Sequence, residues 1–532
     1  MITALTIGSL IVLICISSGQ FIHRFGMPAL IIFLVLGAIA GALPIEQKLI
    51  DPHIAENIGE VALIFVMFYG GFGTNWKTAR PVAIKAGLLA SVGVCITALA
   101  VTLFAHFIIT LGWMESFLLG AIISCTDAAS VFSILRTKKM NLKHNTVSVL
   151  EIENGSNDPT AYLLTLVALL IMKGGPLLEV PLLIAKQLIF GVAIGVGIAL
   201  LAIPLIMRFS RYFADGMDLV FVFAIAILTF ALSQILGGNG YLAAFLCGII
   251  LGNSAIPNKV KMAHFFDSVD WFGQIMIFFV LGLLVVPINL IPAILPAIGL
   301  TLFLLLIARP LAVFLIFRLR GSPVRQCLLI SWVGLRGAAS LVFAVLATTS
   351  GVALESDLFS IVVLTAFFSI TLQGTLLEQV ARRLDMIDTE SDVMKSFTDF
   401  QESSERAFLK MKMHPEHIWI GTALRDLEIG QESLIVLIKR GEQTIAPKGD
   451  TVIMPNDILV MTGDSYNDED GAQITQVLVA KGDDWADTLV KDLSLPDNTL
   501  VANVTKEDGS SVTPKGWTKI HPGDTVTLIT WD

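Results

Sequence analysis

Long apolar segments, each bounded by Gly, Pro or charged residues, follow one another through the first 384 residues and constrain this chain most. A transmembrane helix needs about 20 such residues, so the pattern predicts about thirteen spans. The chain has 55% hydrophobic and 15% charged residues, a composition that excludes both a single soluble globule and a disordered chain. Its five cysteines are scattered, so a disulfide framework is not expected. The expected spans lie near 2–20, 28–43, 60–74, 83–111, 116–135, 146–172, 180–207, 216–235, 239–254, 264–286, 290–317, 326–349 and 357–377.

The charges divide the chain into two parts. Residues 1–384 hold 22 basic and 17 acidic side chains, whereas the remaining residues hold 13 basic and 27 acidic ones. We therefore expect an all-α polytopic membrane domain over 1–384, followed by a small, acidic α+β domain in the cytoplasm. An acidic tail argues against a nucleic-acid partner.

The basic residues of the connecting loops predict the orientation of the chain. One set of alternate loops holds sixteen Lys and Arg residues, and the other set holds only Lys48 and Lys173. Loops rich in Lys and Arg face the cytoplasm. This asymmetry predicts that the N-terminus lies outside the cell and the C-terminal tail in the cytoplasm.

The sixth expected span carries most of the polar side chains that are costly inside a membrane, namely Glu151, Glu153, Asn154, Asn157 and Asp158. At about 100° per residue, Asp158 shares a helix face with Asn154 and Glu151. Glu153 lies roughly 140° around the helix from Asp158, so the two carboxylates are not expected to form a dyad. Glu151 lies near the cytoplasmic end of the span, where it would line a solvated funnel.

Two further spans are predicted to be interrupted. Thr126-Asp127 in the fifth span and the glycines around Arg336 in the twelfth are candidate helix breaks, which expose backbone groups that can coordinate an ion. Arg309 or Arg336 is the expected partner of Glu153, either within an ion site or as a purely structural pair. Asp127 and Arg309 are expected to offset the charges of the half-helix ends rather than to bind an ion.

Four motifs in the same order resemble those of the monovalent cation:proton antiporters. In that family's NhaP-like branch, which includes the animal sodium/proton exchangers, the motif Glu-Ser-x-x-Asn-Asp is similar to residues 153–158. Thr126-Asp127 resembles the family's Thr-Asp-Pro, and residues 334–338 and Ala308-Arg309 resemble its two arginine motifs. The resemblance covers residues 1–385.

The resemblance implies a role for each matching residue. Asp158 would bind either a proton or a cation, Thr126 and Glu153 would be cation ligands or support them, and Asn157 would donate a structural hydrogen bond. Arg336 would pair with Glu153, and Arg309 would balance the crossed half-helices.

Two residues depart from the family pattern. Asn154 stands where the family has a Ser ligand, and Ala128 replaces the Pro of the fifth span.

The family also implies inverted repeats, broken crossing helices, homodimers and no cofactor. The Asn157-Asp158 pair implies electroneutral exchange.

Competition for one carboxylate gives the expected mechanism. Burial favours the protonated form of a carboxyl group, so such a group can trade a proton for an alkali cation near neutral pH. We therefore expect a potassium/proton antiporter of a bacterial inner membrane, with the N-terminus in the periplasm. The first alternative is sodium/proton antiport at the same site. A ligand-gated potassium channel is less favoured because the sequence contains no Thr-x-Gly-Tyr-Gly filter. An enzyme is not expected, since the sequence has no nucleophile elbow, phosphate-binding loop or metal motif.

The tail contains an internal repeat. A series that includes Asp426-Leu427, Leu434, residues 447–449 and Asp457 recurs 66 to 67 residues later, with Pro-Lys-Gly in both copies. After a linker at 385–413, residues 414–465 resemble the C-terminal RCK (TrkA-C) domain, and 484–532 are a diverged second copy. Such domains dimerise and bind regulatory ligands, but a dimerisation module without a ligand fits the sequence equally well.

Overall fold

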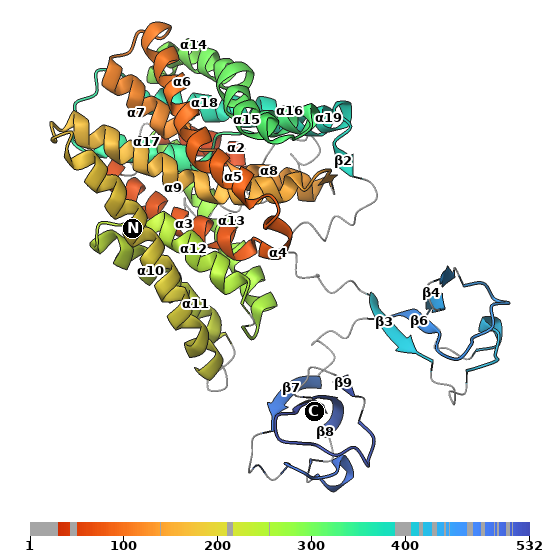
Figure 1. The fold of residues 1–532 in the computed structure, drawn as a ribbon. Coiled ribbons are helices and arrows are strands. Elements are labelled where there is room, and N and C mark those ends of the chain that lie inside the picture. Colours follow the sequence, from red (N-terminus) through yellow and green to blue (C-terminus); the bar gives the residue numbers. More distant parts are fainter. Residues whose placement is uncertain are drawn as a thin grey trace. The chain divides into compact units, whose positions relative to one another are not determined.

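The computed structural model divides into two compact units, residues 1–400 and 401–532, which are described separately (Figure 1). The residues that it describes are 30–42, 51–138, 140–209, 216–254, 256–388, 406–413, 419–427, 434–440, 443–445, 447–464, 472–479, 483, 485–493, 495–496, 499–506, 511–512 and 514–531.

The first unit is a bundle of helices (Figure 1). In chain order they are α2 (Leu30–Gly41), α3 (Pro52–Gly73), α4 (Trp76–Ala79), α5 (Ala83–Leu88), α6 (Val94–Phe107), α7 (Trp113–Ile123), α8 (Ala128–Thr137), α9 (Thr146–Met172), α10 (Glu179–Phe209), α11 (Met217–Ile235), α12 (Gly240–Gly252), α13 (Lys259–Leu283), α14 (Pro287–Phe303), α15 (Arg309–Phe317), α16 (Val324–Trp332), α17 (Ala338–Thr349), α18 (Leu358–Ser369) and α19 (Thr375–Arg383). A two-stranded ribbon, β1 (Asn141–Leu142) with β2 (Ile387–Asp388), completes the unit.

The helices confirm the polytopic membrane fold. Within the described residues, seven helical segments are long and apolar enough to cross a membrane. They are Pro52–Gly73, Ala83–Phe107, Glu179–Arg208, Met217–Ile235, Lys259–Leu283, Pro287–Arg320 and Leu358–Arg383. The remaining expected spans from 28 onward coincide with α2, α9, α12 and two pairs of half-helices. The span expected at 2–20 lies outside the described residues, so the total of thirteen stays a prediction.

Helix α9 contains the polar residues of the sixth span and packs closely on its neighbours. Pro159 lies inside the helix and has no N–H to donate. The Pro159 carbonyl oxygen accepts a hydrogen bond from the Asn239 side-chain amide at 2.9 Å. A Cβ at Gly155 would lie 2.0 Å from the ring of Phe245, so glycine is required where α12 approaches α9. These contacts fix α9 against α12.

The second unit contains two four-stranded antiparallel sheets, each described by itself. Their orders are β3-β6-β4-β5 and β7-β10-β8-β9, so corresponding strands occupy corresponding positions. The strands are β3 (Arg406–Lys412), β4 (Leu434–Arg440), β5 (Gln443–Ile445), β6 (Ile458–Asp464), β7 (Ala472–Leu478), β8 (Thr499–Thr505), β9 (Ser511–Val512) and β10 (Thr525–Trp531). The shared order agrees with the sequence repeat. Strands β3 and β7 begin before residues 414 and 484, respectively.

Each sheet buries one aspartate at the same position of the repeat. The Asp457 carboxylate accepts two hydrogen bonds from Arg440, both at 2.8 Å, and one from the Met454 N–H at 2.9 Å. In the second sheet, Asp524 pairs with Lys506 at 2.5 Å and accepts from the His521 N–H at 2.8 Å. Arg440 and Lys506 are 66 residues apart. In both copies, a basic side chain at the end of the second strand therefore pairs with the aspartate of the turn that precedes the last strand.

Replacing Asp457 with Asn should destabilise the first sheet by about 2 kcal/mol at pH 7, because it removes a charge-assisted bidentate pair. The hydrogen bond from Arg440 lowers the pKa of Asp457. A lowered pKa gives stability above the unfolded-state value, about 4, that is lost as the pH falls through the folded-state value. The difference in the free energy of unfolding between variant and wild type should therefore become smaller below about pH 4.

Urea-dependent hydrogen exchange of β4 and β6 in the full-length protein, read by mass spectrometry, measures this difference. Asp450→Asn, which changes an exposed turn residue, is the control and should have no effect. An equal loss of protection at pH 7 and at pH 3 would contradict the assigned role of the Asp457–Arg440 pair.

Candidate cation and proton site

The site lies where two broken helices meet. Residues 124–127 separate α7 from α8, and residues 333–337 separate α16 from α17. The Asp127 N–H donates a hydrogen bond to the Leu335 carbonyl oxygen at 2.8 Å, so the two interruptions are in direct contact. Both expected breaks are therefore present, and Ala128 in place of Pro does not prevent the first. Unwound backbone of this kind provides polar groups inside a membrane protein.

Arg336 binds the C-terminal end of the half-helix α7. Its side chain is 1% exposed, and Nη1 donates hydrogen bonds to the carbonyl oxygens of Ser124 at 2.8 Å and Cys125 at 2.5 Å. The carbonyls beyond the end of a helix carry partial negative charge. Arg336 thus balances a half-helix end, which is the role that the family resemblance implies for Arg309.

Asp127 caps the N-terminal end of α8. Its carboxylate accepts hydrogen bonds from the Ser130 hydroxyl at 2.5 Å and from the Ser130 N–H at 3.4 Å. A Cβ at Gly337 would lie 2.1 Å from Asp127 Oδ2, so only glycine allows the start of α17 to approach this carboxylate. Asp127 therefore places negative charge beside the N-terminal ends of two half-helices.

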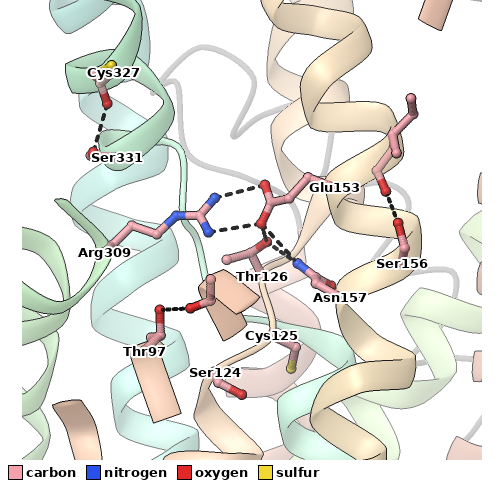
Figure 2. Close-up of polar contacts among 12 residues, drawn as sticks. Thr97, Ser124, Cys125, Thr126, Glu153, Ser156, Asn157, Arg309, Cys327 and Ser331 are labelled. Atoms are coloured by element: carbon pink, nitrogen blue, oxygen red, sulfur yellow. Dashed lines mark hydrogen bonds and ion pairs between the residues drawn. The ribbon is translucent and has the colours of Figure 1, made fainter. Parts of the chain in front are cut away.

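Glu153 forms a bidentate ion pair with Arg309 and not with Arg336, the partner that the resemblance implies (Figure 2). The Arg309 Nη1 and Nη2 atoms lie 2.9 and 2.8 Å from Oε1 and Oε2 of Glu153. The side chains are 3% and 0% exposed. Because Arg336 is held by the carbonyls of the α7 end, Arg309 is the guanidinium that meets Glu153. The pair leaves little net charge on Glu153.

Thr126 and Asn157 extend this ion pair into a buried network (Figure 2). The Thr126 hydroxyl donates to Glu153 Oε1 at 3.2 Å. The Asn157 amide donates to the Thr126 hydroxyl at 2.5 Å and to Glu153 Oε1 at 3.3 Å. The structure thus brings together Thr126, Glu153, Asn157 and Arg309, and the amide of Asn157 is used for a hydrogen bond within the protein, as the resemblance implies.

Asp158 lies beside this network and is 5% exposed. Within the described part of the chain, Asp158 Oδ1 and the side-chain oxygen of Asn157 have no hydrogen-bond partner. A buried oxygen acceptor without a partner is costly, and an alkali cation or a proton would satisfy it. The geometry therefore leaves one buried oxygen on Asp158 and one on Asn157 without a partner among the described residues, and cation binding by them stays a prediction.

The other predicted residues are less clearly placed at the site. Glu151 is half-buried on α9, and its position in a cytoplasmic funnel stays a prediction. The side chain of Asn154 lies outside the described residues. Sequence reasoning missed Cys125 and Ser340, whose Sγ and Oγ atoms lie 3.1 Å apart at the crossing. Their positions in the sequence, next to the two predicted helix breaks, could have indicated that they lie near each other.

The membrane unit matches the family model described as "Sodium/hydrogen exchanger, transmembrane" over residues 9–383. The chain belongs to this exchanger family. Residues 410–467 of this exchanger also match the TrkA-C domain model, in agreement with the domain expected in the tail.

Relatives of this exchanger match most of its length. The "K(+)/H(+) antiporter NhaP" of Alkalimonas amylolytica is 37% identical over 72% of this chain and 67% of its own length. The "K(+)/H(+) antiporter NhaP2" of Shewanella sp. (strain MR-4) is 31% identical over 92% of this chain and 87% of its own. The solved structure of the sodium proton antiporter MjNhaP1 from Methanocaldococcus jannaschii shares the fold, with a TM-score of 0.61 and 21% identity over 72% of this chain and 99% of that one.

Proposed function

We propose that this exchanger carries out electroneutral antiport of potassium ions for protons across a bacterial inner membrane. The observation that carries the proposal is the buried Asp158, whose Oδ1 has no hydrogen-bond partner within the described residues and lies beside the crossing of two broken helices. Deprotonated Asp158 would bind the cation, and protonation would release it. If the protein changes the side to which it opens only when Asp158 is occupied, the two gradients are coupled.

The charge of the site supports a one-for-one exchange. Glu153 is neutralised by its bidentate pair with Arg309, and Asp127 caps α8. Asp158 is then the carboxylate left to alternate between a proton and a monovalent cation. One cation replaces one proton, so the charge carried across the membrane is the same in both directions.

Two kinds of similarity favour potassium as the cation. Both relatives described above carry names that state potassium/proton antiport. The TrkA-C domain in the tail is typical of potassium systems. The family description names sodium, which makes sodium/proton antiport at the same site the second candidate.

The remaining parts of the proposal concern the assembly and orientation. We infer a homodimer in membrane lipid, with the N-terminus in the periplasm and the tail in the cytoplasm. The basic loops on one side support this orientation. Residues 414–465 and 484–532 would form two related regulatory domains, which bind a small ligand or serve only in dimerisation.

Proteoliposomes that contain a pH-sensitive dye and hold an outward gradient of potassium or sodium test the proposal. The expected result is acidification of the lumen that requires the cation gradient, proceeds without an uncoupler and is faster with potassium. Its initial rate should not change when a membrane potential is imposed.

Other outcomes would contradict parts of the proposal. A faster response to sodium would make sodium/proton antiport the favoured function, with potassium/proton antiport as the second candidate. A rate that depends on membrane potential would overturn the electroneutral mechanism. Proton movement that appears only with an uncoupler would indicate a uniporter or a channel.

A further inference from the structure

Helix α12 contacts its neighbours in two different ways. Its backbone lies directly against α3 and α10, because a Cβ at Gly71 or Gly248 would lie 2.2 Å from a backbone oxygen of the facing helix, and one at Gly195 would lie 2.6 Å from the Ala243 oxygen. The contacts that fix α9 against α12 in this structure run through side chains instead. Small residues let helix backbones pack closely, whereas side-chain contacts can be remade when packed helices slide. Of these three interfaces, the one with α9 can therefore open most readily.

Four aromatic side chains lie just beyond Asp158, toward the C-terminal end of α9. Tyr162 follows Asp158 by one helical turn and shares its face of α9. The centroid of its ring lies 5.0 Å from that of Tyr241 in α12 and 5.6 Å from that of Phe343 in α17, and Tyr241 also lies 5.0 Å from Phe230 in α11. All four residues are at most 7% exposed. This cluster, which we call the aromatic seal, lies on the periplasmic side of Asp158 in the orientation proposed above.

Two hydrogen bonds join α9 to α11 and α12 at the aromatic seal. The Gln234 amide, at the end of α11, donates to the Tyr162 hydroxyl at 3.1 Å. Asn239 is the N-cap of α12 and is 1% exposed. Its side-chain amide donates to the Pro159 carbonyl oxygen at 2.9 Å, and its side-chain oxygen accepts from the Leu242 N–H at 3.0 Å. The bonds of Gln234 to Tyr162 and of Asn239 to Pro159 must break if α9 moves away from α11 and α12.

We propose that the aromatic seal is the barrier that closes the cation site toward the periplasm, and that the hydrogen bonds of Gln234 and Asn239 hold it closed. The inference rests on the proposed function, in which the site opens to each side in turn. Breaking either bond should raise the fraction of molecules that are open to the periplasm. Potassium that arrives from this side should then bind with a higher apparent affinity, whereas binding from the cytoplasm should change little.

Cysteine labelling from the periplasmic side measures this opening. Ala161 is fully buried on α9 and lies between Asp158 and Tyr162 in the sequence, so Ala161→Cys places a thiol behind the seal. A membrane-impermeant thiol reagent is added to right-side-out vesicles, and labelling of the peptide that contains residue 161 is followed by mass spectrometry. Tyr162→Phe and Asn239→Ser should each raise the labelling rate about fivefold, because each removes one hydrogen bond that opposes opening. Serine still caps α12, so the helix itself is retained.

Exchange kinetics without the introduced cysteine give a second readout. In right-side-out vesicles, the KM for potassium on the periplasmic face should fall about fivefold in Tyr162→Phe and in Asn239→Ser. In inverted vesicles, the KM for potassium on the cytoplasmic face should stay within about twofold of the wild-type value. A contact that served only stability would not change the two faces differently.

The chain offers matched controls among the contacts of α3 with α12 and α13. Asn253, at the other end of α12, donates to the Thr74 carbonyl oxygen at 2.8 Å. The Tyr69 hydroxyl of α3 donates to Asp267 of α13 at 2.7 Å. Asn253→Ser and Tyr69→Phe each remove a hydrogen bond between helices of the same kind, and they should leave the labelling rate and both KM values unchanged.

Three results would overturn the inference: unchanged labelling in the Tyr162 and Asn239 variants, an equal increase in the control variants, or equal KM shifts on the two faces. These results would leave antiport by the wild type intact. Absence of antiport in the wild type would instead contradict the proposed function itself.

Discussion

Replacing Asp158 with Asn should abolish cation-driven proton flux in proteoliposomes, because the amide can neither bind a proton at neutral pH nor supply a negative charge to the cation. The change is nearly isosteric, and Asp158 Oδ1 has no hydrogen-bond partner to lose among the described residues. The free energy of unfolding should therefore stay the same or rise by about 1 kcal/mol, since a buried carboxylate is removed. Flux assays and thermal unfolding of the purified variant measure the two effects.

Asp127→Asn is the matched control for this variant. Asn caps a helix about as well as Asp, so the side chain at position 127 should still accept the hydrogen bond from the Ser130 hydroxyl at the start of α8. We expect coupled exchange to persist in this variant. Exchange that survives in Asp158→Asn would remove Asp158 from the mechanism, and a variant that fails to fold would contradict the expected stability.

Replacing Arg309 with Met has the largest expected effect on stability. The substitution leaves Glu153 buried without its bidentate partner, at a cost of about 3–5 kcal/mol. Adding Glu153→Gln removes the unpaired charge, so the double variant should recover most of this loss. Thermal unfolding of the variants in detergent, followed by tryptophan fluorescence, measures the recovery.

Arg336 provides the comparison that identifies the partner of Glu153. Its guanidinium binds the carbonyls of Ser124 and Cys125, so Arg336→Met should also destabilise the protein. Glu153→Gln should not rescue this variant, because the two side chains are not paired. A rescue of Arg336→Met, together with none for Arg309→Met, would show that the pairing described here is wrong.

The sequence was sufficient to locate the spans from residue 28 onward and both helix breaks, because hydropathy and local polar or glycine-rich segments determine them. It could not decide between Arg309 and Arg336 as the partner of Glu153. Each arginine lies near the middle of an apolar segment, and the choice depends on how α7 and α16 end at the crossing. The spacing on α9 did separate Glu153 from Asp158, and the structure gives the two carboxylates different surroundings.

The repeat in the tail was also visible in the sequence, since Asp457 and Asp524 recur at a fixed offset. Their basic partners were not identified, although Arg440 and Lys506 recur at an offset of 66 residues. The contact between Cys125 and Ser340 joins residues 215 positions apart. No local pattern brings such residues together, so only the tertiary fold could place them in contact where the two broken helices meet.

Proton release on cation binding tests the central claim most directly, because it measures the competition at Asp158 without transport. Purified wild-type protein in detergent and weak buffer, near the pH at which exchange is half-maximal, is titrated with potassium chloride while a pH indicator is followed. Choline chloride controls for ionic strength. We expect up to about one proton released per chain with potassium, and none with choline or in Asp158→Asn. Potassium binding without proton release, or equal release from Asp158→Asn, would contradict a shared site for the two ions.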